Sequence, residues 1–147
     1  MIDQTHIDLS RYRLEKSADM LSAARRDFDG DDFASANNRA YYCIFHAIRA
    51  VLALDGEDFK KHSAVIARFT MNYLKTEKLP SDYSKLISNA SLIRNRSDYE
   101  DFYFCSANET KRLIDGARDF HNAVRDYLDS LPPENLTRQS FDNTAMW

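Results

Sequence analysis

Two arginines and two tyrosines lie close together in the second half of the chain, between Arg94 and Tyr103. The guanidinium groups of Arg94 and Arg96 present donors in a fixed fork that matches the oxygens of a phosphate. The phenols of Tyr99 and Tyr103 can donate a hydrogen bond, stack on a base or accept a transferred nucleotide. This segment therefore has the residue types needed to bind a phosphodiester or a nucleotide.

The same arginines also fit a structural role. If the segment is helical, Arg94 can form an ion pair with Asp98, four residues further on. Arg96 can pair with Glu100 in the same way. Such pairs stabilise a helix by only about 0.2–0.5 kcal/mol each. The residue types alone leave both interpretations open.

A second cluster of cations, Lys60 and Lys61 followed by His62, precedes an expected helix start. Backbone N–H groups at a helix N-terminus favour an anion, so these three side chains are candidate phosphate or RNA contacts. The alternative is a solvated loop in which Ser63 caps the helix.

Polar and aromatic residues interrupt an otherwise apolar stretch that ends at His46. We expect His46 to be a core histidine that is hydrogen-bonded to a neighbouring helix. Tyr41 and Tyr42 are expected to pack in the core. This third cluster is therefore expected to support the structure first.

Helices must position these clusters, and the spacing of apolar residues predicts five of them. The expected helices cover about residues 9–29, 33–54, 63–76, 81–93 and 106–131. The second is the most apolar and should lie at the centre of the molecule. Long helices with short connections favour antiparallel neighbours, so the predicted fold is all-α, an up-and-down antiparallel bundle.

The expected helix starts have recognisable capping residues. Asp31 or Asp32 can cap the second helix, and Ser81 after Pro80 can cap the fourth. Ser106 and Glu109 have the spacing of a capping box at the start of the fifth. The expected organisation is one helical domain, residues 1–131, followed by a C-terminal tail, residues 132–147.

Whole-chain properties restrict the possible functions. A net charge of −3 gives the chain no overall attraction to nucleic acid, so RNA contact requires a local basic patch. We find neither an apolar run of membrane-spanning length nor a signal-peptide pattern, and expect a cytoplasmic protein without membrane contact. Cys43 and Cys105 are then expected to be free thiols. The cysteines and histidines lack metal-site spacing, so no metal or cofactor is predicted.

Three motifs, in order along the chain, resemble the HEPN family. They are Tyr-Tyr-x-x-Phe-His from residue 41, Lys-Lys-His-Ser from residue 60 and Arg-x-x-x-Asp-Tyr from residue 94. The similarity covers about residues 10–128. Each motif alone is weak evidence, but three in this order are specific for the fold and the family.

The resemblance implies a helical bundle that forms a homodimer, and many HEPN proteins are metal-independent ribonucleases. In the family an arginine holds the scissile phosphate, and a nearby histidine transfers a proton to or from the attacking 2′-hydroxyl. Arg94 matches the arginine, Asn95 matches the polar residue after it, and Tyr99 stands in the place of the histidine. A phenol is a poorer general base than an imidazole at neutral pH, so His62 is an alternative if its helix begins beside Arg94.

A further implication of the resemblance concerns regulation. In HEPN toxins that are paired with a minimal nucleotidyltransferase antitoxin, the partner transfers AMP to a tyrosine four residues beyond the motif histidine. Counting from Tyr99, that position is Tyr103, with Tyr99 itself as second choice. If this stretch is helical, the two tyrosines share one face. Aromatic residues around them, Phe102 and Phe104, are suited to a dimer interface.

Three functional hypotheses remain open. The first is a toxin-like dimer that cleaves RNA through Arg94, Asn95 and Tyr99 and is regulated by a nucleotidyltransferase. The second is a non-catalytic interaction or nucleotide-binding module in a complex with that nucleotidyltransferase. The third is a helical dimer of unrelated role, in which the arginines and tyrosines only pack and form ion pairs.

Overall fold

The computed structural model describes residues 3–131, which fold into helices without any strand. The helices are α1 (Gln4–Asp29), α2 (Phe33–Leu54), α3 (His62–Phe69), α4 (Tyr83–Tyr99) and α5 (Ala107–Asp129), with a π-helical turn, η1 (Thr70–Leu74), continuing α3. The predicted all-α bundle of five helices is confirmed. The expected tail, residues 132–147, lies outside the described residues, so the domain boundary stays a prediction.

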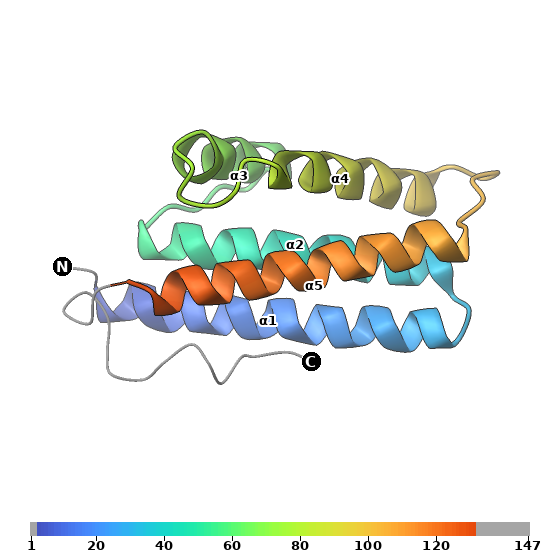
Figure 1. The fold of residues 1–147 in the computed structure, drawn as a ribbon, viewed down its shortest axis with the longest axis horizontal. Coiled ribbons are helices and arrows are strands. Elements are labelled where there is room, and N and C mark those ends of the chain that lie inside the picture. Colours follow the sequence, from blue (N-terminus) through green and yellow to red (C-terminus); the bar gives the residue numbers. More distant parts are fainter. Residues whose placement is uncertain (1–2, 132–147) are drawn as a thin grey trace.

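α1 and α2 run antiparallel, as do α2 and α4, and α4 and α5 (Figure 1). α2 and α5 also pack together but run in the same direction, and α3 lies across one end of the bundle. α2 packs against α1, α3, α4 and α5, which confirms its predicted central position. Its buried alanines let the neighbouring helices approach closely: Ala36, Ala40, Ala47 and Ala50. Because α2 packs against both α3 and α4, it fixes where the polar residues of these two helices lie relative to each other.

Short polar side chains fix three of the helix starts. Asp32 accepts a hydrogen bond from the backbone N–H of Ser35, so Asp32 rather than Asp31 caps α2. Ser106 caps α5 by accepting from the N–H of Glu109, as predicted. α1 begins earlier than expected because the Asp3 side chain caps it.

The prediction that Ser81 caps the fourth helix is wrong. α4 begins at Tyr83, after Asp82, and has no side-chain cap. The carbonyl of Ser81 accepts from the N–H of Ser84 in a backbone turn, which leaves the Ser81 hydroxyl outside the capping position. The third helix also differs, because it begins at His62 and widens into η1 at Thr70.

Buried polar contacts join the helices inside the core. The Ser17 hydroxyl on α1 donates to the carbonyl of Cys43 on α2 at 2.7 Å and lies 2.8 Å from Nδ1 of His121 on α5. Cys43 is fully buried, and burial raises the pKa of its thiol to about 12. Both Cys43 and Cys105 are free, as predicted.

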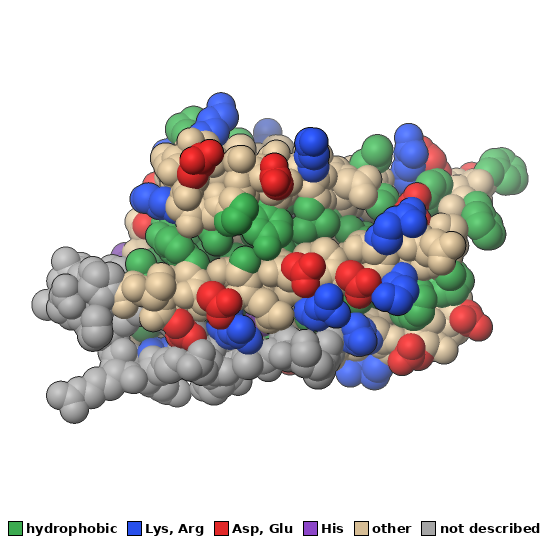
Figure 2. Space-filling model, viewed as in Figure 1, with side chains coloured by type: hydrophobic (Ala, Val, Ile, Leu, Met, Phe, Trp, Pro, Cys, Tyr) green, Lys and Arg blue, Asp and Glu red, His purple; other side chains and the backbone are tan. Residues whose placement is uncertain are grey.

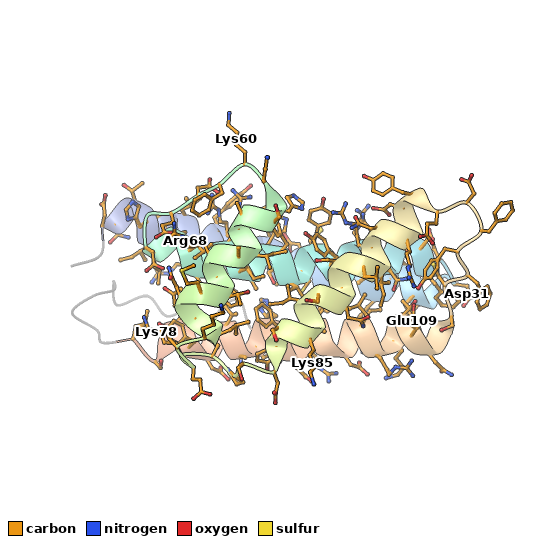
Figure 3. All side chains as sticks on the ribbon, turned by 90° about the horizontal axis from the view of Figure 1, so that it is seen from above. Asp31, Lys60, Arg68, Lys78, Lys85 and Glu109 are labelled. Carbon is orange, nitrogen blue, oxygen red and sulfur yellow. The ribbon has the colours of Figure 1, made fainter. Side chains whose placement is uncertain are left out.

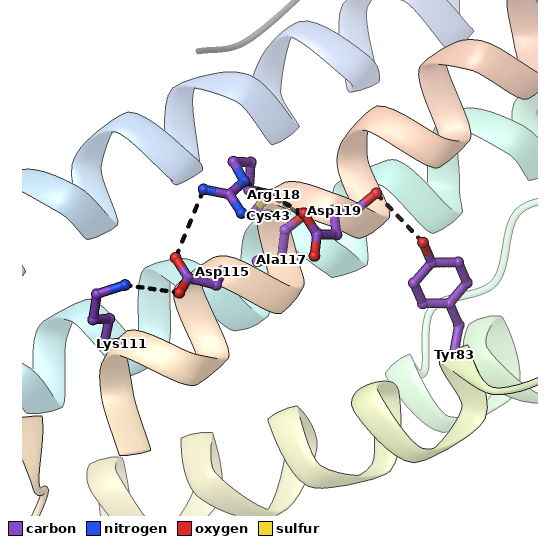
Figure 4. A network of polar contacts seen from close by, with 7 residues as sticks. All are labelled: Cys43, Tyr83, Lys111, Asp115, Ala117, Arg118 and Asp119. Atoms are coloured by element: carbon purple, nitrogen blue, oxygen red, sulfur yellow. Dashed lines mark hydrogen bonds and ion pairs between the residues drawn. The ribbon is translucent and has the colours of Figure 1, made fainter. Parts of the chain in front are cut away.

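The outer face of α5 is charged, and an apolar strip separates it from α4 (Figure 2). On that face Asp115 pairs with Lys111 and Arg118, and the Tyr83 hydroxyl of α4 donates to the carbonyl of Asp119 (Figure 4). These ion pairs lie within α5, so the contact between α4 and α5 depends on the Tyr83 hydrogen bond and on apolar packing. Between residues 3 and 131, no helix is long and apolar enough to cross a membrane.

Candidate functional site

Arg94 lies on the inner side of α4, with only 15% of its side chain exposed. Its guanidinium carbon stands 4.7 Å from the centre of the Tyr41 ring and 5.7 Å from that of Tyr42. One terminal nitrogen is 3.8 Å from the carboxylate of Asp98, which is the ion pair predicted from spacing. The Nε atom is buried without a hydrogen-bond partner among the described residues. The guanidinium of Arg94 is therefore fixed in position by the two rings and Asp98, and its Nε–H donates to no group among the described residues.

A groove of about 540 Å³ opens beside Arg94, between α2, α3 and α4. Its polar lining comes from Tyr41 on α2, His62 and Ser63 on α3, and Ser88, Ser91, Arg94 and Asn95 on α4. We call this the Arg94 groove. It brings together two of the predicted catalytic residues, Arg94 and Asn95, with His62 from the second sequence cluster.

His62 is the first residue of α3, and its ring is fixed by three aromatic residues of α2. It stacks on Phe45 with ring centres 4.1 Å apart and meets Tyr42 edge to face. Its Nδ1 atom is 3.0 Å from the Tyr41 hydroxyl. Burial lowers the pKa of His62 below 6.5, and the charges of Arg94 and Arg49 lower it further. The imidazole is therefore neutral at pH 7.

Tyr41 connects Arg94 and His62. Its side chain is buried, the face of its ring lies against the Arg94 guanidinium, and its hydroxyl is hydrogen-bonded to His62. Burial raises the pKa of Tyr41, against the opposing charge of Arg94. The prediction that Tyr41 packs in the core is confirmed, but its polar role was missed. Only the hydroxyl on an otherwise apolar helix face signalled it.

Tyr99, the third predicted catalytic residue, does not line the Arg94 groove. It ends α4 with 75% of its surface exposed and borders a separate groove with Asn38 and Asp98. Asp98 stands between the two grooves, because it contacts Arg94 and also accepts a hydrogen bond from Asn38 at 2.9 Å. Asn38 is a further residue whose placement the sequence did not reveal.

The other predicted phosphate contacts also lie outside the Arg94 groove. Lys60 projects from the loop before α3, away from the bundle (Figure 3), and borders a neighbouring pocket that also includes Arg49 and His62. Lys61 is exposed immediately before α3, and because the helix begins at His62, Ser63 is not its cap. Arg96 is exposed and 4.0 Å from Glu100, as the ion-pair interpretation predicted.

Tyr103 lies in the loop between α4 and α5. Because α4 ends at Tyr99, the stretch up to Tyr103 is not helical, and the condition under which the two tyrosines would share a face is not met. The Tyr103 hydroxyl donates a hydrogen bond to the carboxylate of Glu109. Partial burial and this carboxylate raise the pKa of Tyr103 to about 12. Phe102 and Phe104 on either side are largely exposed.

His46 differs from its predicted role. It is partly buried beside Tyr42 and Phe45, but its Nδ1 atom is buried with no hydrogen-bond partner within residues 3–131. Burial lowers the pKa of His46 to about 4, and the nearby charges of Lys16 and Arg49 act in the same direction. An imidazole surrounded by cations remains neutral and cannot add to the local positive charge.

The side chains that line the Arg94 groove determine which chemistry it can support. Across residues 3–131, no three histidine, cysteine, aspartate or glutamate side chains are grouped so that they could hold a metal. The groove instead presents a fixed cation, a neutral imidazole and several hydroxyl and amide groups. These are the groups that bind a phosphodiester and move a proton.

Residues 10–127 match the HEPN domain family, and the chain belongs to that family. A protein of Methanocaldococcus jannaschii named "Putative toxin MJ0142" is 28% identical over 131 residues, covering 89% of this chain and 87% of its own length. A UPF0332 protein of Thermotoga maritima is 28% identical over 120 residues, covering 82% and 91%. "Putative toxin MJ0605" of M. jannaschii is 31% identical over 86 residues, covering 58% and 64%.

Proposed function

We propose that this protein is a HEPN toxin that cleaves RNA without a metal, at the Arg94 groove. The observation that carries the proposal is the environment of Arg94, a largely buried guanidinium whose Nε has no partner among the described residues and which opens onto a groove that also holds an imidazole. A phosphodiester would add a second anion beside Asp98 and accept hydrogen bonds from the guanidinium. The names of two relatives support a toxin role.

The binding of RNA at this groove would depend on local rather than overall charge. The chain carries a net charge of −3, so it gains little from general attraction to the phosphate backbone. Arg94 would hold one phosphate, with Asn95 beside it as an uncharged donor and acceptor. Three further cations are exposed outside the Arg94 groove: Lys60, Lys61 and Arg96. They would contact phosphates only further along a bound strand.

Expression of the chain in a bacterial host tests the proposal. The unmodified protein is expected to arrest growth, and Arg94→Ala is expected to relieve the arrest. Arg118→Ala is the matched control, because Arg118 forms ion pairs on the outer face of α5, away from the groove. Equal arrest by Arg94→Ala and the unmodified chain, at equal soluble levels, would contradict the proposal.

We further propose that a minimal nucleotidyltransferase acts as the antitoxin and transfers AMP to Tyr103. The partly exposed loop position and the hydrogen bond to Glu109 support this choice. In the transfer, the Tyr103 oxygen bonds to the α-phosphorus of ATP and pyrophosphate leaves. The phenolic proton passes to the Glu109 carboxylate. Tyr99 is more exposed but has no such hydrogen-bond acceptor among residues 3–131, and it is the second choice.

Mass measurement after co-expression with a nucleotidyltransferase encoded beside this gene tests the modification. The chain is expected to gain the mass of one AMP, Tyr103→Phe is expected to abolish the gain, and Glu109→Gln is expected to slow it. Tyr12→Phe, which changes an exposed tyrosine on α1, is the control. A mass gain that survives Tyr103→Phe but not Tyr99→Phe would transfer the assignment to Tyr99.

A second candidate function is a non-catalytic HEPN module that binds a nucleotide or the nucleotidyltransferase. The exposed position of Tyr99, outside the Arg94 groove, favours this second function. Tyr99 stands in the place of the family's proton-transfer histidine, so that residue does not lie beside Arg94 in the groove. This candidate predicts RNA or nucleotide binding that depends on Arg94, with no cleavage. Binding and cleavage measured on the same preparation separate the two functions.

A further inference from the structure

We infer that His62, and not Tyr99, is the proton-transfer residue of the Arg94 groove, and that Tyr41 is its positioning residue; this inference rests on the proposed RNA cleavage. The geometry of a single chain supports it. His62 and Arg94 line the same groove, and Tyr41 contacts both, with its hydroxyl hydrogen-bonded to His62 and its ring against the Arg94 guanidinium. Tyr99 borders a different groove.

The ring of His62 is held in one orientation. Phe45 stacks on it, Tyr42 meets it edge to face, and the Tyr41 hydroxyl lies 3.0 Å from Nδ1. A ring fixed on one face and at one nitrogen leaves Nε2 as the nitrogen that can exchange a proton with a ligand. When Nδ1–H donates to Tyr41, the Nε2 lone pair is free to accept.

The surroundings of His62 keep it in the form that accepts a proton. The titratable and charged groups facing it are Tyr41, Tyr42, His46 and Arg49 from α2, Arg94 from α4, and Asp58 and Lys60 from the loop before α3. Burial lowers the pKa of His62 most, and the charges of Arg94 and Arg49 lower it further. The same Arg94 that attracts a phosphate therefore keeps the neighbouring base neutral.

The proposed reaction is an internal displacement on RNA. Nε2 of His62 accepts the proton of a 2′-hydroxyl while its oxygen bonds to the adjacent phosphorus, and the bond from phosphorus to the 5′-oxygen breaks. The leaving 5′-oxygen takes a proton from water, and the proton on His62 returns to solvent. Arg94 neutralises charge on the phosphate oxygens throughout. The products end in a 2′,3′-cyclic phosphate and a 5′-hydroxyl.

The test is cleavage of a single-stranded RNA oligonucleotide by the full chain in the presence of a chelator, from pH 5 to pH 9. His62→Gln is expected to lower kcat by about 10²-fold or more while the affinity for a 2′-deoxy analogue is retained. Tyr99→Phe and the control His6→Gln, a histidine at the start of α1, are expected to keep the wild-type rate. Tyr41→Phe is expected to lower kcat and leave the affinity unchanged.

The pH profile gives a readout that a structural role for His62 would not produce. The wild-type rate is expected to fall on the acid side below pH 6.5, where His62 becomes protonated. Arg49→Gln removes a charge that lowers the pKa of His62, so it is expected to move this limb to higher pH. Circular dichroism of His62→Gln and a second variant, His62→Asn, checks folding.

Two results separate the inference from the proposed function. If the wild-type chain cleaves and both folded His62 variants cleave equally well with the same acid limb, the inference is overturned and the proposed function stands. If the wild-type chain binds RNA but yields no cyclic-phosphate product at any pH, both are overturned. Loss of cleavage in Tyr99→Phe with full activity in His62→Gln would assign proton transfer to Tyr99, which stands in the place of the family's histidine.

Discussion

Arg94 is the residue on which the functional proposal depends. Its guanidinium is held over two aromatic rings, paired at 3.8 Å with a carboxylate and left with a buried donor that nothing among residues 3–131 satisfies. These contacts hold the guanidinium in one place at the wall of the Arg94 groove, which is the position that the proposed phosphate contact requires.

The residue types of the site could be predicted, but their grouping could not. Arg94, Asn95 and His62 were all candidates from the sequence, and the structure brings them into one groove. The family resemblance puts Tyr99 in the place of the motif histidine, five residues after Arg94. Five residues along a helix turn the side chain to a different face, so Tyr99 emerges into another groove.

His46 makes the stability of the fold depend on pH. Its pKa in the folded chain is about 4, below the unfolded value of 6.5, so the unfolded state binds more protons in this range. The stability that depends on neutral His46 is fully present above pH 6.5 and is lost as the pH falls towards 4. We expect the free energy of unfolding to drop by about 2–3 kcal/mol between pH 7.5 and pH 4.5.

Urea unfolding at a series of pH values measures this effect. His46→Leu is expected to flatten most of the dependence between pH 7.5 and pH 4.5. The remainder is assigned to His62, whose pKa is also lowered. Met71→Leu, which changes an exposed side chain without a titratable group, is the control and is expected to keep the full slope. An unchanged slope in His46→Leu would show that another group binds the protons.

At the scale of elements, α2 does most of the positioning. It contacts each of the other helices, and its aromatic residues hold both the start of α3 and the inner side of α4. The sequence predicted the number of helices, their order and which one is central. These features follow from the spacing of apolar residues and from the positions of helix-breaking residues. It could not predict that α3 begins at His62 or turns into η1, because these depend on contacts between helices.

The start of α5 offers a direct test of the helix assignments. Ser106→Ala removes the side-chain acceptor for the N–H of Glu109 and is expected to cost about 1 kcal/mol of unfolding free energy. Ser84→Ala, an exposed position in the first turn of α4, is the matched control and should change stability little. Chemical denaturation measures both. Equal stability of the two variants would argue against the Ser106 cap.

At the scale of the whole molecule, the exposed aromatic residues at the α4–α5 end stand out. Phe102 and Phe104 are largely exposed, and Figure 2 shows hydrophobic side chains projecting at this end. Exposed large aromatic residues are typical of interfaces. We therefore expect the homodimer predicted from the family resemblance to use this end of the molecule.

Light scattering on purified protein at micromolar concentration tests this expectation. The wild-type chain is expected to have twice the mass of one protomer, and Phe102→Asp combined with Phe104→Asp is expected to shift it to a monomer. Met71→Asp, an exposed apolar position at the opposite end of the bundle, should remain a dimer. A wild-type monomer would contradict the prediction.

The central claim is that the Arg94 groove cleaves RNA without a metal. The most direct measurement is incubation of a mixed RNA pool with the purified full chain and a chelator, beside Arg94→Ala and the control Arg118→Ala. We predict cleavage by the wild-type chain and by Arg118→Ala, and a loss of at least about 10²-fold with Arg94→Ala. Intact RNA in all three reactions, or equal cleavage in all three, would contradict the claim.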